Sequence, residues 1–150
     1  MSRIKQIFKN ENFEKEMRSV ISNFKEVSRV SKSMDSNFYS YSVNDETVTI
    51  EFPVLEYQLN EHDTMHAGFI ATAFDEALGI FASFLCDGKP SVSINISLNY
   101  IKPIPKNDSI LITAKVTSLG RRFITMSGEC RLKSNEMLTN TALATFAIVG

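Results

Sequence analysis

Two adjacent carboxylates interrupt the most apolar stretch of the chain. Asp75 and Glu76 lie within residues 69–85, where most other positions are Phe, Ile, Leu or Ala. The polar positions Thr72, Asp75, Glu76 and Ser83 follow the three- to four-residue period of a helix. A carboxylate among apolar groups costs free energy unless it has a partner. We therefore expect one of the two either to hold a structural partner or to serve a function.

Two histidines lie just before this stretch and raise the question of a metal. His62 and His66 are four residues apart, with Glu61 and Asp63 beside them. That spacing places two metal-binding side chains on one face only if the segment is helical. The segment has the character of a loop, so we expect no metal ligands here.

The elements that position these residues can be predicted from their periodicity. Residues 69–85 are apolar around most of a helix, which is typical of an interior helix. Their shortness and two carboxylates argue against a membrane span. Residues 12–32 predict one amphipathic helix that covers an end of the sheet or docks on a second subunit. A membrane-surface role is the weaker alternative, because glutamates are interleaved with its basic residues.

The remainder of the chain predicts strands. A hairpin is expected at residues 38–43 and 47–52, and four further strands at residues 91–101, 109–119, 123–132 and 137–149. The order predicts an α+β fold in which a curved antiparallel sheet wraps the central apolar helix. Such a sheet leaves strand edges exposed, and pairing two sheets in a dimer would protect them.

Composition narrows the class of protein. The 150 residues fit one domain, and a formal net charge of −1 disfavours a nucleic-acid partner. Cys86 and Cys130 are expected to be reduced thiols, with Cys86 packing as a small apolar residue. The first residues have no signal-peptide pattern, so we expect a cytoplasmic protein.

Several motifs, taken together, resemble one family. Asn60 is followed six residues later by His66-Ala67-Gly68, and Asp75 comes nine residues after the histidine. Glu76-Ala77-Leu78-Gly79 follows, and further on come Asn99-Tyr100-Ile101-Lys102-Pro103 and Asn107-Asp108. Residues 38–149 are thereby similar to the hotdog-fold acyl-CoA thioesterases, in particular the phenylacetate-pathway-like subfamily of the 4-hydroxybenzoyl-CoA thioesterase superfamily. The family's Asn, His-Gly-Gly and Asp are matched except that Ala67 replaces the first Gly, and Asn107 replaces the Gly of a later Gly-Asp.

The resemblance implies a site for thioester hydrolysis. Asp75 would act as general base or nucleophile, and the backbone N–H groups of Ala67 and Gly68 would stabilise the oxyanion. Asn60 would hold the attacking water or the thioester carbonyl, His66 would orient the loop, and Ser93 would position the water. Asp75 lies about 12 Å along the helix from Ala67, so the resemblance implies that Asp75 acts on a thioester held by a second subunit.

The resemblance also implies how the substrate is held. The acyl group would lie in a dimer interface against Phe74, Leu78 and Phe81, and the phosphates of coenzyme A would meet cations at Lys102, Arg121 and Arg122. No cofactor is implied, since coenzyme A is part of the substrate, and the assembly would be a dimer or a dimer of dimers. We expect residues 1–35 to form an N-terminal amphipathic helical extension and residues 36–150 the thioesterase domain. The alternatives are a non-catalytic acyl-CoA binding protein and, less favoured, a hotdog dehydratase or hydratase.

Overall fold

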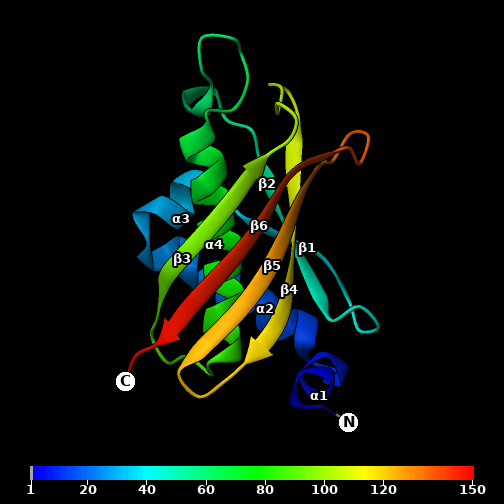
Figure 1. Cartoon of the computed structure of the whole chain (residues 1–150), viewed down its shortest axis with the longest axis vertical. Coiled ribbons are helices and arrows are strands. Elements are labelled where there is room, and N and C mark those ends of the chain that lie inside the picture. Colours follow the sequence, from blue (N-terminus) through cyan, green and yellow to red (C-terminus); the bar gives the residue numbers. More distant parts are fainter. Residues whose placement is uncertain (1) are drawn as a thin grey trace.

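A six-stranded antiparallel sheet and one long helix form the body of the computed structural model, which describes residues 2–150 (Figure 1). The helices are α1 (Arg3–Lys9), α2 (Phe13–Val27), α3 (Arg29–Met34) and α4 (Ala67–Leu85), with a 3₁₀ turn η1 (Glu56–Gln58) before α4. The strands are β1 (Asn37–Ser42), β2 (Thr47–Pro53), β3 (Ser91–Tyr100), β4 (Ser109–Leu119), β5 (Phe123–Leu132) and β6 (Leu138–Ile148). They pair in the order β1-β2-β4-β5-β6-β3. The predicted α+β architecture is confirmed.

Helix α4 is the centre of the core. It begins after His66, whose side chain caps the first turn, and it packs along the concave face of the sheet (Figure 1). Gly128 of β5 lets the sheet approach closely, because a Cβ there would lie 3.1 Å from the Phe74 ring. By length and composition α4 could also cross a membrane, but its buried side chains lie in this core. The predicted interior helix is confirmed.

The N-terminal segment differs from the single helix predicted over residues 12–32. Ser28 has an extended backbone, ends α2 and caps α3 by accepting a hydrogen bond from the Ser31 N–H at 3.2 Å. A serine favours such a cap over a helix interior, which explains the break. The break leaves Val27 and Val30 exposed, although a single helix over residues 12–32 would place both on its apolar face. An additional helix, α1, precedes α2 and was not predicted.

The N-terminal helices contribute to the core. Phe8, Phe13, Met17 and Ile21 are buried, and the Phe8 and Phe13 rings stack with centroids 4.7 Å apart. Phe13 also meets Phe84 of α4 edge to face at 5.2 Å. The amphipathic character of α2 is therefore confirmed. The division of the chain at residue 35 stays a prediction.

Both cysteines are buried and free, as expected of reduced thiols. Burial raises the pKa of Cys130 to about 12, although hydrogen bonding with Thr139 acts in the opposite direction. Cys86 contacts the apolar core, which confirms its role as a small apolar residue.

Candidate active site

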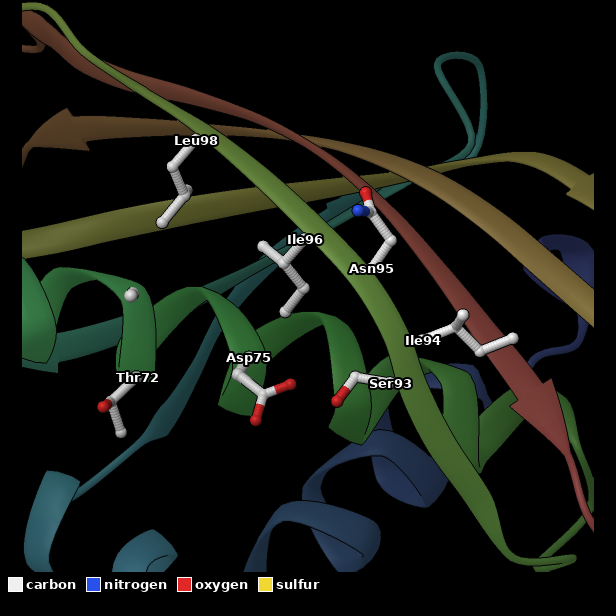
Figure 2. A pocket seen from close by; sticks show the side chains of 8 residues that line it. Thr72, Asp75, Ser93, Ile94, Asn95, Ile96 and Leu98 are labelled. Carbon is white, nitrogen blue, oxygen red and sulfur yellow. The ribbon is translucent and has the colours of Figure 1, made fainter.

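Asp75 faces a groove between α4 and β3. The groove has a volume of about 390 Å³, and Asp75, Thr72 and Ala71 line it from the helix. The strand contributes Ser93, Ile94, Asn95, Ile96 and Leu98. Figure 2 shows the Asp75 carboxylate and the Ser93 hydroxyl directed toward the same space. The structure therefore brings together two of the predicted catalytic residues.

A β-bulge places Ser93 beside Asp75. Ile96 and Leu98 face α4, so regular alternation along β3 would turn Ser93 to the opposite side of the sheet. Ser93 pairs with Phe146 and Asn95 pairs with Thr145, which leaves Ile94 as an extra residue. Such a bulge reverses the side-chain alternation, and Figure 2 shows Ile94 pointing away from the Asp75 side. This segment alternates almost perfectly between polar and apolar residues, so its pattern carries no sign of the bulge.

The surroundings of Asp75 affect its pKa in two opposite directions. Part of its surface is open to solvent, but neighbouring protein atoms desolvate the carboxylate and raise its pKa. The neighbouring Ser93 hydroxyl acts in the opposite direction and lowers the pKa. A carboxylate with a raised pKa is a stronger proton acceptor once it is ionised, which suits a general base.

Glu76 has a structural role. Its carboxylate accepts a hydrogen bond from the Ser31 hydroxyl at 2.5 Å, which links α4 to α3. Burial raises the pKa of Glu76, the bond with Ser31 lowers it, and the nearby charge of Asp75 raises it further. The partner that a half-buried carboxylate needs is thus present for Glu76.

A second group of predicted residues surrounds the start of α4. Nδ1 of His66 accepts a hydrogen bond from the Gly68 N–H at 2.9 Å, so His66 orients this turn. The Ala67 N–H has no hydrogen-bond partner within residues 2–150 and is exposed. The φ angle of Ala67 is not positive, so its Cβ causes no backbone strain where the similar family has glycine. Of the two predicted oxyanion donors, the Ala67 N–H is free, whereas the Gly68 N–H already donates to His66.

Asn60 organises the loop before α4. Its side-chain oxygen accepts from the His62 N–H at 2.9 Å and the Thr64 N–H at 3.2 Å. Asn60 also lines a hollow of about 330 Å³ with Ala67, Tyr100 and Lys102. Tyr100, which was not predicted as a site residue, donates its hydroxyl to the Ala67 carbonyl at 3.0 Å. Its only signal in the sequence is a polar ring at the end of a strand.

The two groups do not meet within one chain. Ala67 and Asp75 are eight residues apart on one helix, a rise of about 12 Å.

The cations predicted to bind phosphate lie at two ends of the molecule. Lys102 lies near the start of α4, whereas Arg121 and Arg122 lie in the turn between β4 and β5 at the other end of the sheet (Figure 1). All three cations are exposed.

The residues predicted to contact the acyl group lie in the core of the single chain. Phe74, Leu78 and Phe81 are 0% exposed within the single chain. Phe74 and Leu78 approach Gly128 of the sheet, and Phe81 contacts Phe8 of α1. Their side chains fill the core and do not reach a surface that a second chain could cover. The apolar sequence indicated a buried helix but not which of its faces meets the sheet.

The described residues hold no cluster of three or more possible metal ligands. His62 is exposed and lies 3.5 Å from the carboxylate of Glu61.

Asn107, where the similar family has glycine, has φ of 63°, a conformation that asparagine tolerates better than most residues. This explains how the replacement is accommodated.

The fold and the motif residues define a hotdog protein of the thioesterase type. Residues 62–138 match the thioesterase superfamily, and the chain belongs to that family. The chain is 33% identical over 81 residues to acyl-coenzyme A thioesterase THEM4 of Xenopus laevis, an alignment covering 54% of this chain and 36% of that protein. The chain spans between about a third and two thirds of the length of the curated relatives it matches.

Solved structures share the fold. The PaaI protein of E. coli, from the phenylacetic acid degradation operon, superimposes with a TM-score of 0.78 at 15% identity, covering 91% of this chain and 95% of that one. Thioesterase superfamily member 2 from Mus musculus gives a TM-score of 0.74 at 23% identity, covering 99% and 100%. The predicted hotdog fold and family resemblance are confirmed.

Proposed function

We propose that this protein is an acyl-CoA thioesterase that hydrolyses an apolar or aryl acyl-CoA to the free acid and coenzyme A. The observation that carries the proposal is Asp75, which lies beside Ser93 at an open groove in a chain of the thioesterase superfamily. The relative THEM4 of Xenopus laevis is an acyl-coenzyme A thioesterase, which supports this choice.

We further propose that each site is shared between two chains. Strand β3 forms one edge of the sheet, and exposed apolar side chains lie on it and next to it at Val92, Ile94 and Leu143. An exposed edge of this kind favours pairing with another strand. Two β3 strands paired antiparallel about a two-fold axis would set the start of one beside the end of the other.

That pairing would complete the site. Ser93 is near the start of β3 and faces Asp75, whereas Tyr100 ends β3 and contacts Ala67. Asp75 of one subunit would then approach the free N–H of the partner subunit's Ala67. The same pairing would set the Arg121 and Arg122 end of one subunit beside the Lys102 end of the other, where these cations would bind the phosphates of coenzyme A.

In the proposed reaction, Asp75 acts as general base toward water or attacks the thioester carbonyl itself. As a base it takes a proton from water, whose oxygen then bonds to the carbonyl carbon. The carbonyl oxygen becomes an oxyanion, which the Ala67 N–H at the positive end of the α4 dipole stabilises. The C–S bond then breaks, and coenzyme A leaves as the thiolate. Ser93 orients the water, and Asn60 and His66 keep the loop in place.

The two free cysteines support a reducing compartment, and we propose the cytoplasm as the location. No cofactor is needed for the proposed chemistry.

Thiol release from a panel of acyl-CoA esters tests the function. We expect turnover by the unaltered protein and a loss of about 10²- to 10⁴-fold in kcat for Asp75→Asn, since a positioned base contributes that much. Isosteric asparagine keeps the packing, and unchanged circular dichroism controls for folding. Tight binding of acyl-CoA without turnover would favour a binding protein instead, and water addition to an enoyl-CoA would favour a hydratase.

A further inference from the structure

Asp75 and Ser93 line a second hollow in addition to the groove described above. This second hollow has a volume of about 420 Å³ and extends from Asp75 toward the C-terminal end of α4. Its walls come from α4, from the segment that leads into β3, and from Phe24 of α2. Because the same two residues line both hollows, the second one opens directly at the candidate base.

Small side chains on one face of α4 leave this space. Asp75, Gly79 and Ser83 are four residues apart and therefore share a helix face. A Cβ at Gly79 would lie 3.7 Å from the Phe146 ring, an ordinary contact, so the packing does not require glycine here. Glycine inside a helix destabilises it relative to alanine. A glycine that costs stability and is not imposed by its neighbours indicates that the open space itself is useful.

The walls of this hollow combine apolar and polar groups. An apolar part of the lining comes from Phe24, Ile80, Pro90, Val92 and Phe146, whereas Ser83, Lys89 and Ser91 contribute polar groups. Glu76 also lines the hollow, and its carboxylate accepts the hydrogen bond from the Ser31 hydroxyl. A volume of several hundred cubic ångströms is typical of a small-molecule site.

Resting on the proposed thioesterase function, we infer that this hollow receives the apolar acyl chain, and that Gly79 and Phe24 set the longest chain accepted. In this arrangement the acyl chain lies along α4 toward its C-terminal end and does not contact Phe74, Leu78 or Phe81. Phe24 comes from the N-terminal helices, so this segment takes part in substrate selection.

Chain-length profiles test the inference. We would measure kcat/KM for a series of saturated acyl-CoA esters with the unaltered protein and with Gly79→Leu and Phe24→Ala. Leucine at position 79 fills the hollow, so kcat/KM for the longest accepted chains should fall by about 10-fold or more while that for acetyl-CoA stays within about threefold, since each methylene excluded or accommodated changes kcat/KM by such factors. Alanine at position 24 should extend the profile to longer chains.

Matched variants make the profiles interpretable. Val20→Ala changes an apolar residue one turn earlier on α2 that does not line this hollow, and it should leave the profile unchanged. Gly79→Ala adds only a Cβ that fits, and it should give a smaller shift in the same direction as Gly79→Leu. If Gly79→Leu does not fold, Gly79→Ala and Phe24→Ala still decide the question.

The inference and the proposed function fail in different ways. Asp75-dependent hydrolysis with the same profile in all variants would overturn the inference and leave the function standing. If the unaltered protein hydrolyses no acyl-CoA, the proposed function fails. The affinities of S-hexyl- and S-dodecyl-coenzyme A thioethers, measured by calorimetry, then test whether the hollow binds the acyl chain. Affinities that respond to length and shift in Gly79→Ala and Phe24→Ala support the acyl hollow, whereas affinities that ignore both substitutions overturn it.

Discussion

The Asp75 carboxylate is partly desolvated and lies beside the Ser93 hydroxyl. Desolvation raises its pKa, and the Ser93 hydroxyl counters part of that effect. The proposed base is active when ionised, so turnover should fall as the pH drops through the pKa of Asp75. Ser93 therefore increases the fraction of Asp75 that is ionised at a given pH, although desolvation has the larger effect on its pKa.

Ser93→Ala should shift the acid limb of the pH profile, which is the range where kcat/KM falls as Asp75 becomes protonated. Losing the hydroxyl removes stabilisation of the charged form, so the pKa of Asp75 rises and the limb of kcat/KM shifts to higher pH. At alkaline pH, where Asp75 is ionised in both proteins, the rates should agree within about 10-fold, because only the positioning of water is lost. Ser93→Thr, which keeps a hydroxyl, is the control. An unshifted limb in Ser93→Ala would show that the limb does not report Asp75.

Ala67 offers an unusually clean test of the oxyanion donor. Proline is favoured at the first position of a helix, and the preceding residue, His66, already has the extended backbone that proline requires (ψ of 138°). Ala67→Pro should therefore delete one N–H while preserving α4. We expect kcat to fall by about 10²- to 10³-fold, the usual effect of losing one such donor. Ala67→Gly keeps the N–H and should retain activity, and equal rates in both variants would contradict the role.

At the scale of elements, one polar contact joins the N-terminal helices to the central one. The Ser31 hydroxyl donates to Glu76, and Ser31 is 0% exposed. Ser31→Ala leaves a half-buried carboxylate without its donor and should lower the free energy of unfolding by about 1.5–3 kcal/mol. Chemical denaturation measures this change.

A double-mutant cycle separates this contact from packing. In Glu76→Gln the charge is gone, so adding Ser31→Ala should cost less than it does in the unaltered protein. Equal costs in the two backgrounds would mean that the charge of Glu76 adds nothing to its contact with Ser31.

Some of these elements could be predicted from the sequence and others could not, for physical reasons. Periodicity marked α4 and the strands because burial selects apolar residues on one face or in alternation. The bulge at Ile94 could not be predicted, because a single inserted residue leaves the alternating pattern intact while it redirects Ser93. The break at Ser28 was missed because apolar residues continue in helical register beyond it.

The candidate site was predicted in part. The structure brings together Asp75 and Ser93, and separately Asn60, Ala67 and Lys102, around hollows of their own. Phe74, Leu78 and Phe81 lie in the core of the chain, and the sequence could not indicate this because hydrophobicity predicts burial without distinguishing a core contact from a substrate contact. Tyr100 and Phe24 were missed because their positions beside the site depend on tertiary packing between segments far apart in the sequence.

At the scale of the whole molecule, the separation of the two groups of site residues makes assembly testable. Mixed subunits of Asp75→Asn and Ala67→Pro, refolded or co-expressed, should regain activity although each variant alone has little. In a two-fold dimer about half of the pairs are mixed and each has one intact site, so about a quarter of full activity is expected. Mixing Asp75→Asn with unaltered subunits gives the reference for exchange. No recovery in proven mixed dimers would place the complete site within one chain.

The 12 Å that separate Ala67 from Asp75 along α4 have a consequence for how turnover scales with abundance. If neither chain is competent alone, dilution below the dissociation constant of the pair lowers the rate per molecule as well as the total rate. Doubling the number of copies in that regime would raise output about fourfold, since pair formation follows the square of the monomer concentration. Expression level would then act as a steep control on flux without any separate regulatory ligand.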